Sequence, residues 1–135
     1  MATPFLVDTT AWSATLMGFF ALFAAIGALR KPGVWQTMVV EIEKSPALQM
    51  LCGFAELVAG ALVYLANPWI PSDILTCVMR ALGGLMIVEA LVVLGFSDIY
   101  FHFWLKSLSF MHRAWALASL VAGLALAGAG LARFS

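Results

Sequence analysis

The sequence predicts an all-α membrane protein with four transmembrane helices and two amphipathic interfacial connectors on the cytoplasmic side. Hydrophobic residues make up 64% of the 135 positions and charged residues only 10%, with a mean hydropathy of +1.02. A soluble domain is about 45 to 50% apolar and about 25% charged. Four apolar segments each approach the roughly 20 residues that cross a bilayer. Residues 1–135 therefore form one transmembrane domain.

The first two spans have clear local boundaries. The first covers about residues 11–29 and is ended by the run Arg30-Lys31-Pro32, because cations favour the last turn of a helix and proline follows it. The second covers about residues 46–66. It begins after Ser45, a good N-cap residue, with Pro46 at the first helical position.

The third and fourth spans follow a proline-rich turn at residues 67–71. The third span covers about residues 73–96 and starts with Ser72-Asp73 as capping residues. The fourth covers about residues 114–132. All four segments are long enough to cross a membrane.

Both longer connectors have amphipathic periodicity. Between residues 34 and 44, apolar side chains recur every four positions beside Trp35. In the second connector, the polar residues fall on one stripe opposite an apolar face that contains Trp104. This stripe comprises Asp98, His102, Lys106, Ser109 and Arg113. We expect two short helices in the headgroup region, with Trp35, His102, Trp104 and His112 at the interface. Such helices either cap the bundle or recruit lipid or protein.

The positive charges predict the orientation of the chain. Five of the seven Lys and Arg residues lie in the two longer connectors, and none lies between residues 67 and 72. Short connectors rich in Lys and Arg stay in the cytoplasm. We therefore expect a multi-pass protein of the bacterial inner (plasma) membrane with both termini in the periplasm.

A short internal repeat accompanies the spans. Residues 55–60 (AELVAG) match residues 118–123 (ASLVAG) at five of six positions. Each half then consists of a span, a flat helix and a second span. Since both halves enter from the same side, the repeat predicts a pseudo-twofold axis along the membrane normal.

Three ionisable residues lie at membrane depth, where each costs roughly 2.5 to 3.5 kcal/mol unless it has a partner or water. They are Glu56, Arg80 and Glu89. Glu56 either accepts a hydrogen bond from Arg80 or is protonated. Glu89 faces away from Arg80 on the same helix. Its partner is expected in the first span, in a second subunit or in the water layer. These three residues are the candidates for binding or coupling.

Small residues predict where helices approach closely. Gly53 and Gly60 share a face with Glu56 on the second span, and the fourth span has a small-residue stripe. Stripes of this kind let helix backbones come together. This stripe comprises Ser119, Gly123 and Ala127. We expect the two faces to meet near the pseudo-axis, which would place Glu56 close to Ser119.

Several function classes are excluded or disfavoured. A net charge of zero leaves no basic surface for nucleic acid. Catalytic and phosphate-binding motifs are missing, so no enzymatic activity is expected. His102 and His112 lie about 15 Å apart on one helix, too far to hold one metal or haem iron together. No cofactor is expected. Cys52 and Cys77 differ in depth by roughly 17 Å and are expected to be free thiols.

Residues 35–48 (WQTMVVEIEKSPAL) resemble the signature of a family of small, uncharacterised bacterial inner-membrane proteins with four spans. The similarity continues through Gly53, Gly60 and residues 82–84, although members usually have Lys-Gly in place of Glu89 and its neighbour. A more distant resemblance is to DoxX-like proteins, which carry a Glu-Leu-x-x-Gly element like residues 56–60 here. The first resemblance implies a four-span fold without a known activity, and the second implies a redox or quinone-associated accessory role.

Together these features predict a small integral membrane accessory or scaffold protein. Its expected partners are membrane lipid and either further copies of itself or other membrane subunits. One alternative is a small transporter or proton-coupled carrier that uses Glu56 and Arg80. Another is a quinone-linked redox accessory protein.

Overall fold

The computed structural model describes residues 8–134, which form five α-helices and no strand. The helices are α1 (Thr9–Arg30), α2 (Val34–Glu43), α3 (Pro46–Ala66), α4 (Ile74–Gly95) and α5 (Ser97–Ala132). Four of them, all except α2, are long and apolar enough to cross a membrane. The first three predicted spans correspond to α1, α3 and α4, and each begins and ends within two residues of its helix. The fourth span and the second connector are instead one helix, α5, whose backbone departs from helical geometry at Met111.

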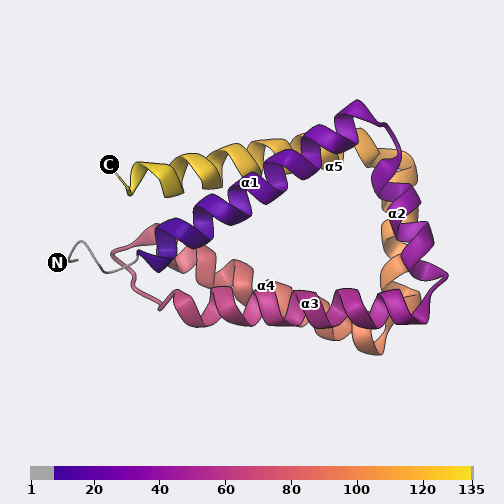
Figure 1. The fold of residues 1–135 in the computed structure, drawn as a ribbon, viewed down its shortest axis with the longest axis horizontal. Coiled ribbons are helices and arrows are strands. Elements are labelled where there is room, and N and C mark those ends of the chain that lie inside the picture. Colours follow the sequence, from indigo (N-terminus) through magenta and orange to yellow (C-terminus); the bar gives the residue numbers. More distant parts are fainter. Residues whose placement is uncertain (1–7, 135) are drawn as a thin grey trace.

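The long helices form two closely packed pairs, α1 with α5 and α3 with α4. Figure 1 shows that the pairs converge where the described chain begins and ends, and separate at the opposite end. There α2 and the first part of α5 (residues 97–110) cross from one pair to the other. We call the first end the closed end and the second the open end.

Side chains at the N-cap positions explain where three helices begin. Asp8 accepts a hydrogen bond from the backbone N–H of Ala11 at 3.0 Å at the start of α1. Ser45 caps α3 in the same way, and Asp73 caps α4 through the N–H of Thr76. Each cap satisfies one of the backbone donors that a helix start leaves free.

Glycine allows close backbone contact within each pair. A Cβ atom on Gly60 of α3 would lie 3.0 Å from the carbonyl oxygen of Gly83 in α4. A Cβ atom on Gly123 of α5 would lie 2.7 Å from the carbonyl oxygen of Gly18 in α1. Because Gly60 and Gly123 end the two matching sequence segments, the repeat makes the same contact twice. The two halves of the chain are therefore related in packing as well as in sequence.

The predicted contact between the second and fourth spans is wrong. Gly53 and Gly60 pack against α4, where a Cβ on Gly53 would meet the Leu94 side chain. Gly123 and Ala127 pack against α1. The small-residue stripes mark faces of close approach, but each stripe packs against the first span of the other half of the repeat: α3 against α4, and α5 against α1.

A charged network joins the two halves at the closed end. Arg133, which follows α5, donates to the Asp73 carboxylate at 2.8 Å and to the Asp8 carboxylate at 3.3 Å. These two aspartates are the N-caps of α4 and α1, so one guanidinium ties together equivalent positions of the repeat. Thr10 and Thr76 also lie 3.2 Å apart between their hydroxyl oxygens, in a buried position. Polar contacts thus link the start of α1 to the start of α4 at the closed end.

Replacing Arg133 with glutamine should destabilise the protein at neutral pH by less than about 1 kcal/mol, because 32% of the Arg133 side chain is exposed. Hydrogen bonding from Arg133 lowers the pKa of the Asp73 carboxyl below its usual value. A lowered carboxyl pKa stabilises the fold above the unfolded value of about 4 and stops doing so as pH falls through the folded value. The difference between R133Q and the wild type should therefore shrink at pH 3.

Thermal unfolding in detergent at pH 7 and pH 3 measures this difference. Arg30 supplies the control, since it is exposed and forms no ion pair within residues 8–134. R30Q should change stability little at either pH. An R133Q deficit that is equally large at both pH values would show that the Asp73 contact does not stabilise the closed end.

Candidate functional site

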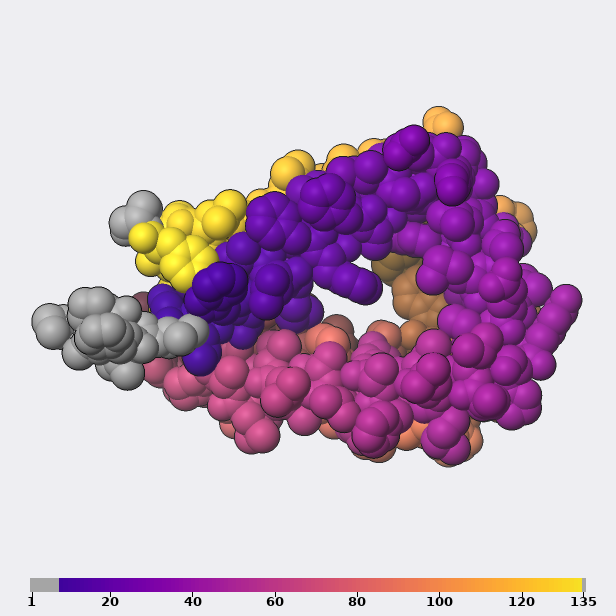
Figure 2. All heavy atoms as spheres, in the orientation of Figure 1, coloured from indigo at the N-terminus to yellow at the C-terminus, as the bar shows by residue number. Residues whose placement is uncertain are grey.

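A large cavity lies between the two helix pairs, on the open-end side of the molecule. Its volume is about 680 Å³, and residues of α1, α2, α4 and α5 line it. Figure 2 shows an opening between α1 and α3 in this part of the molecule. The wall is mainly apolar, with Phe20 from α1, Met38 and Ile42 from α2, and Leu108 from α5. A volume of this size is typical of small-molecule sites.

Three tryptophans give the cavity an aromatic wall. Trp35 comes from α2, and Trp104 and Trp115 come from the two sides of the irregular turn at Met111. The ring centroids of Trp104 and Trp115 are 4.9 Å apart, and the Trp115 indole N–H donates to the Ser107 hydroxyl at 2.7 Å. The irregular turn thus brings two aromatic rings of one helix into contact.

Within the part of the chain that the structure describes, Glu89 is the one ionisable residue in the cavity wall, and other polar residues lie beside it. Its carboxyl lies within hydrogen-bonding reach of Glu56, across the α3–α4 contact. Tyr100 also lies beside Glu89, and its ring is 6.3 Å from the Trp104 ring between centroids. The α3–α4 contact and the start of α5 thus bring two carboxyl groups and a tyrosine together at the cavity.

This arrangement identifies the partner of Glu89. The sequence left open the first span, a second subunit or water, whereas the structure places Glu56 and Tyr100 beside it. Tyr100 was missed because its position depends on how α5 folds back across the open end. Its only sequence signal is its spacing of four residues from Trp104, on the face opposite His102.

Arg80 lies away from the carboxyl pair, near the closed end. Its guanidinium donates to the backbone carbonyl oxygens of Tyr64 at 3.1 Å and Asn67 at 3.2 Å. It also stacks over the Tyr64 ring, 3.8 Å from the centroid. The Arg80 face does turn toward α3, as the sequence allowed. Its partner is the carbonyl end of that helix, where free oxygens and the helix dipole favour a cation, and Glu56 is not involved.

Ser119 also borders the cavity but is not joined to Glu56. Its hydroxyl donates to the carbonyl oxygen of Ala21 in α1 at 2.9 Å. In the repeat, Ser119 is the residue of α5 that corresponds to Glu56 of α3. The expectation that the two side chains meet is therefore wrong, because each lies within its own helix pair.

Asn67 is a buried polar residue that sequence analysis did not single out. It is fully buried, and its amide N–H₂ donates to the Val63 carbonyl oxygen at 2.7 Å. The same group lies 3.4 Å from the Ser13 hydroxyl of α1. Its position at the end of α3 is the only signal in the sequence, since asparagine is common where helices end. Asn67 helps to hold α1 against α3 at the closed end.

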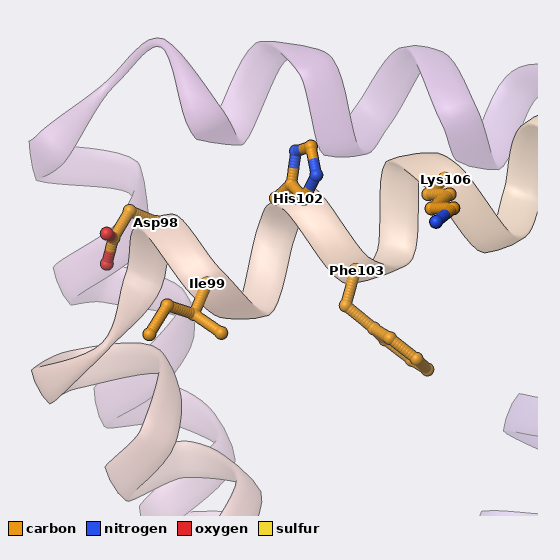
Figure 3. A pocket seen from close by; sticks show the side chains of 5 residues that line it. All are labelled: Asp98, Ile99, His102, Phe103 and Lys106. Carbon is orange, nitrogen blue, oxygen red and sulfur yellow. The ribbon is translucent and has the colours of Figure 1, made fainter.

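A second, shallower pocket lies along the first part of α5. It is lined by Asp98, Ile99, His102, Phe103 and Lys106, all from the first part of this helix. Figure 3 shows Ile99 and Phe103 pointing to the same side of the helix. His112 lines a different pocket, beside the end of α1. Within residues 8–134, no three His, Cys, Asp or Glu side chains gather as a metal site would require.

The comparisons with known proteins leave the site to be interpreted from its geometry. No protein-family model, curated protein or solved structure matches this chain.

Proposed function

We propose that the protein is an integral membrane protein whose four long helices cross the bilayer. Between 11% and 28% of the most apolar part of each long helix is buried inside the protein, so most of it faces outward. Large apolar side chains such as Leu65, Ile74 and Val121 are 65 to 76% exposed. So much exposed apolar surface needs a hydrocarbon environment or a large protein interface. Lipid, further copies of the chain and other membrane subunits are the proposed partners.

The proposed orientation puts the open end in the cytoplasm of a bacterial cell and the closed end in the periplasm. Arg30, Lys31 and Lys44 flank α2 at the open end. The loop between α3 and α4, at the closed end, has no Lys or Arg. Cationic connectors favour the cytoplasmic side. The resemblance of residues 35–48 to a bacterial inner-membrane family supports the same placement.

Within this membrane setting, we propose that the protein is a non-catalytic accessory that binds a small, mainly apolar molecule. The observation that carries the proposal is the cavity between the helix pairs, with its tryptophan wall and a single ionisable group, Glu89. Apolar pockets with few polar groups are typical binding sites. A carrier based on a Glu56–Arg80 pair is less well supported, since Arg80 is held at the end of α3.

The cavity also bears on the quinone-linked alternative. An apolar molecule with a hydrogen-bonding headgroup fits a wall in which Glu89 and Ser119 are the main polar side chains. The DoxX-like element at residues 56–60 lies on α3, next to Glu89. A quinone in the organic extract of the purified protein would favour this alternative over a general binding role.

Filling the cavity should abolish the binding of co-purified molecules. Ala118 lines the cavity on α5, whereas Ala129 is exposed on the same helix, 11 residues further on, and lines none of the pockets described above. A118F should therefore reduce the amount of bound molecule at least tenfold, and A129F should leave it unchanged. Mass spectrometry of organic extracts from protein purified in mild detergent measures the amount. Equal amounts in A118F and the wild type would contradict the proposal.

A further inference from the structure

The cavity has an unbalanced charge. Among the described residues 8–134, Glu89 is the only ionisable residue in its wall, and no Lys, Arg or His lines it. Two titratable groups face Glu89 from the packed helices, Glu56 of α3 and Tyr100 of α5. The parts of α1 and α2 that line the cavity contribute no titratable side chain. Every group that can ionise at this site therefore becomes negative when it loses its proton.

Glu89 has no cationic partner at the cavity among residues 8–134. Its neighbour Glu56 is a second carboxyl group. Arg80 lies elsewhere and donates to the carbonyl oxygens of Tyr64 and Asn67. The site is therefore complementary to a cation that comes from outside the chain.

The wall determines which kind of cation fits. A hard ion such as Ca²⁺ takes six to eight oxygen ligands, but among the residues that line the cavity only Glu89 and Ser119 carry side-chain oxygens. The rest of the wall is aliphatic and aromatic. Tryptophan faces attract cations, most of all where water is excluded. Trp35, Trp104 and Trp115 thus favour an organic cation with a spread charge and apolar substituents.

We propose that the cavity binds a hydrophobic organic cation beside Glu89. Attraction between the cation and this carboxyl group adds to the contact of the cation with the three tryptophans. The inference rests on the proposed binding function and specifies the chemical class of the ligand.

Calorimetric titration of the purified protein in detergent tests the proposal with tetraphenylphosphonium as the probe. We expect saturable binding that is at least tenfold tighter than that of a neutral molecule of similar shape. E89Q should weaken the binding of the cation at least tenfold and leave that of the neutral molecule unchanged. E41Q is the matched control, because Glu41 is exposed on α2 and does not line the cavity.

A neutral aromatic molecule of similar shape, triphenylphosphine oxide, separates this inference from the proposed function. If both probes bind the wild type equally well, the cavity binds apolar molecules but the assignment to cations is wrong. If A118F also leaves the co-purified molecule in place, the binding function itself fails. These wild-type titrations remain decisive even if E89Q does not fold.

Discussion

Replacing Gly123 with isoleucine should lower the free energy of unfolding by about 3 kcal/mol, at the upper end of what overpacking usually costs. A Cβ atom at this position would lie 2.5 Å from the backbone nitrogen of Leu22 and 2.7 Å from the carbonyl oxygen of Gly18. Backbone atoms of α1 cannot rotate away as a flexible side chain can, so the two helices must move apart. Thermal unfolding in detergent measures the loss.

The matched control for G123I is G128I. Gly128 lies on the same helix, but a Cβ there would meet no atom within 4 Å. Isoleucine has a higher helix propensity than glycine, so G128I should be neutral or slightly stabilising. At the equivalent position of the repeat, G60I should cause a loss similar to that of G123I, since its Cβ would lie 2.9 Å from the Met86 Cβ. Equal melting temperatures for G123I and G128I would show that α1 and α5 do not approach so closely.

Local signals in the sequence were sufficient to place most of the helices. The start of α3 was predicted at Pro46, because a serine N-cap followed by proline is specific to a helix start. The start of α4 was predicted one residue early, at Asp73, which is its cap. These boundaries depend on a few adjacent residues, so they can be identified without knowing what the helices contact.

The pairing of the helices could not be identified in the same way. Small-residue stripes occur on several helices, and a stripe shows which face packs closely without naming the partner. From the sequence, the stripe that contains Gly60 was expected to contact the stripe that contains Gly123. In the structure, these two glycines are equivalent positions in two separate contacts. The match between residues 55–60 and residues 118–123 indicated equivalence, and equivalent positions need not touch.

The charged residues were likewise only partly predictable from the sequence. Their apolar surroundings were enough to select Glu56, Arg80 and Glu89 as groups that need partners. Opposite charge then suggested a pair of Glu56 with Arg80, but Arg80 contacts backbone carbonyl oxygens. Glu89 meets a second carboxyl and Tyr100, a combination that charge alone would not suggest.

The proposed membrane topology predicts an all-or-none difference in chemical labelling. Ser72 is exposed at the closed end and Lys44 at the open end. Single cysteines at these positions, S72C and K44C, can be tested in a chain in which both free cysteines, Cys52 and Cys77, are replaced by alanine. A maleimide that cannot cross membranes should then distinguish the two ends, because a bilayer would separate them.

Labelling of bacterial cells that express these variants is the most direct test of whether the four long helices span the membrane. We predict that S72C reacts in intact cells and that K44C reacts only after the inner membrane is permeabilised. Reaction of both cysteines in intact cells would contradict the spanning arrangement, and reaction of K44C alone would contradict the proposed orientation.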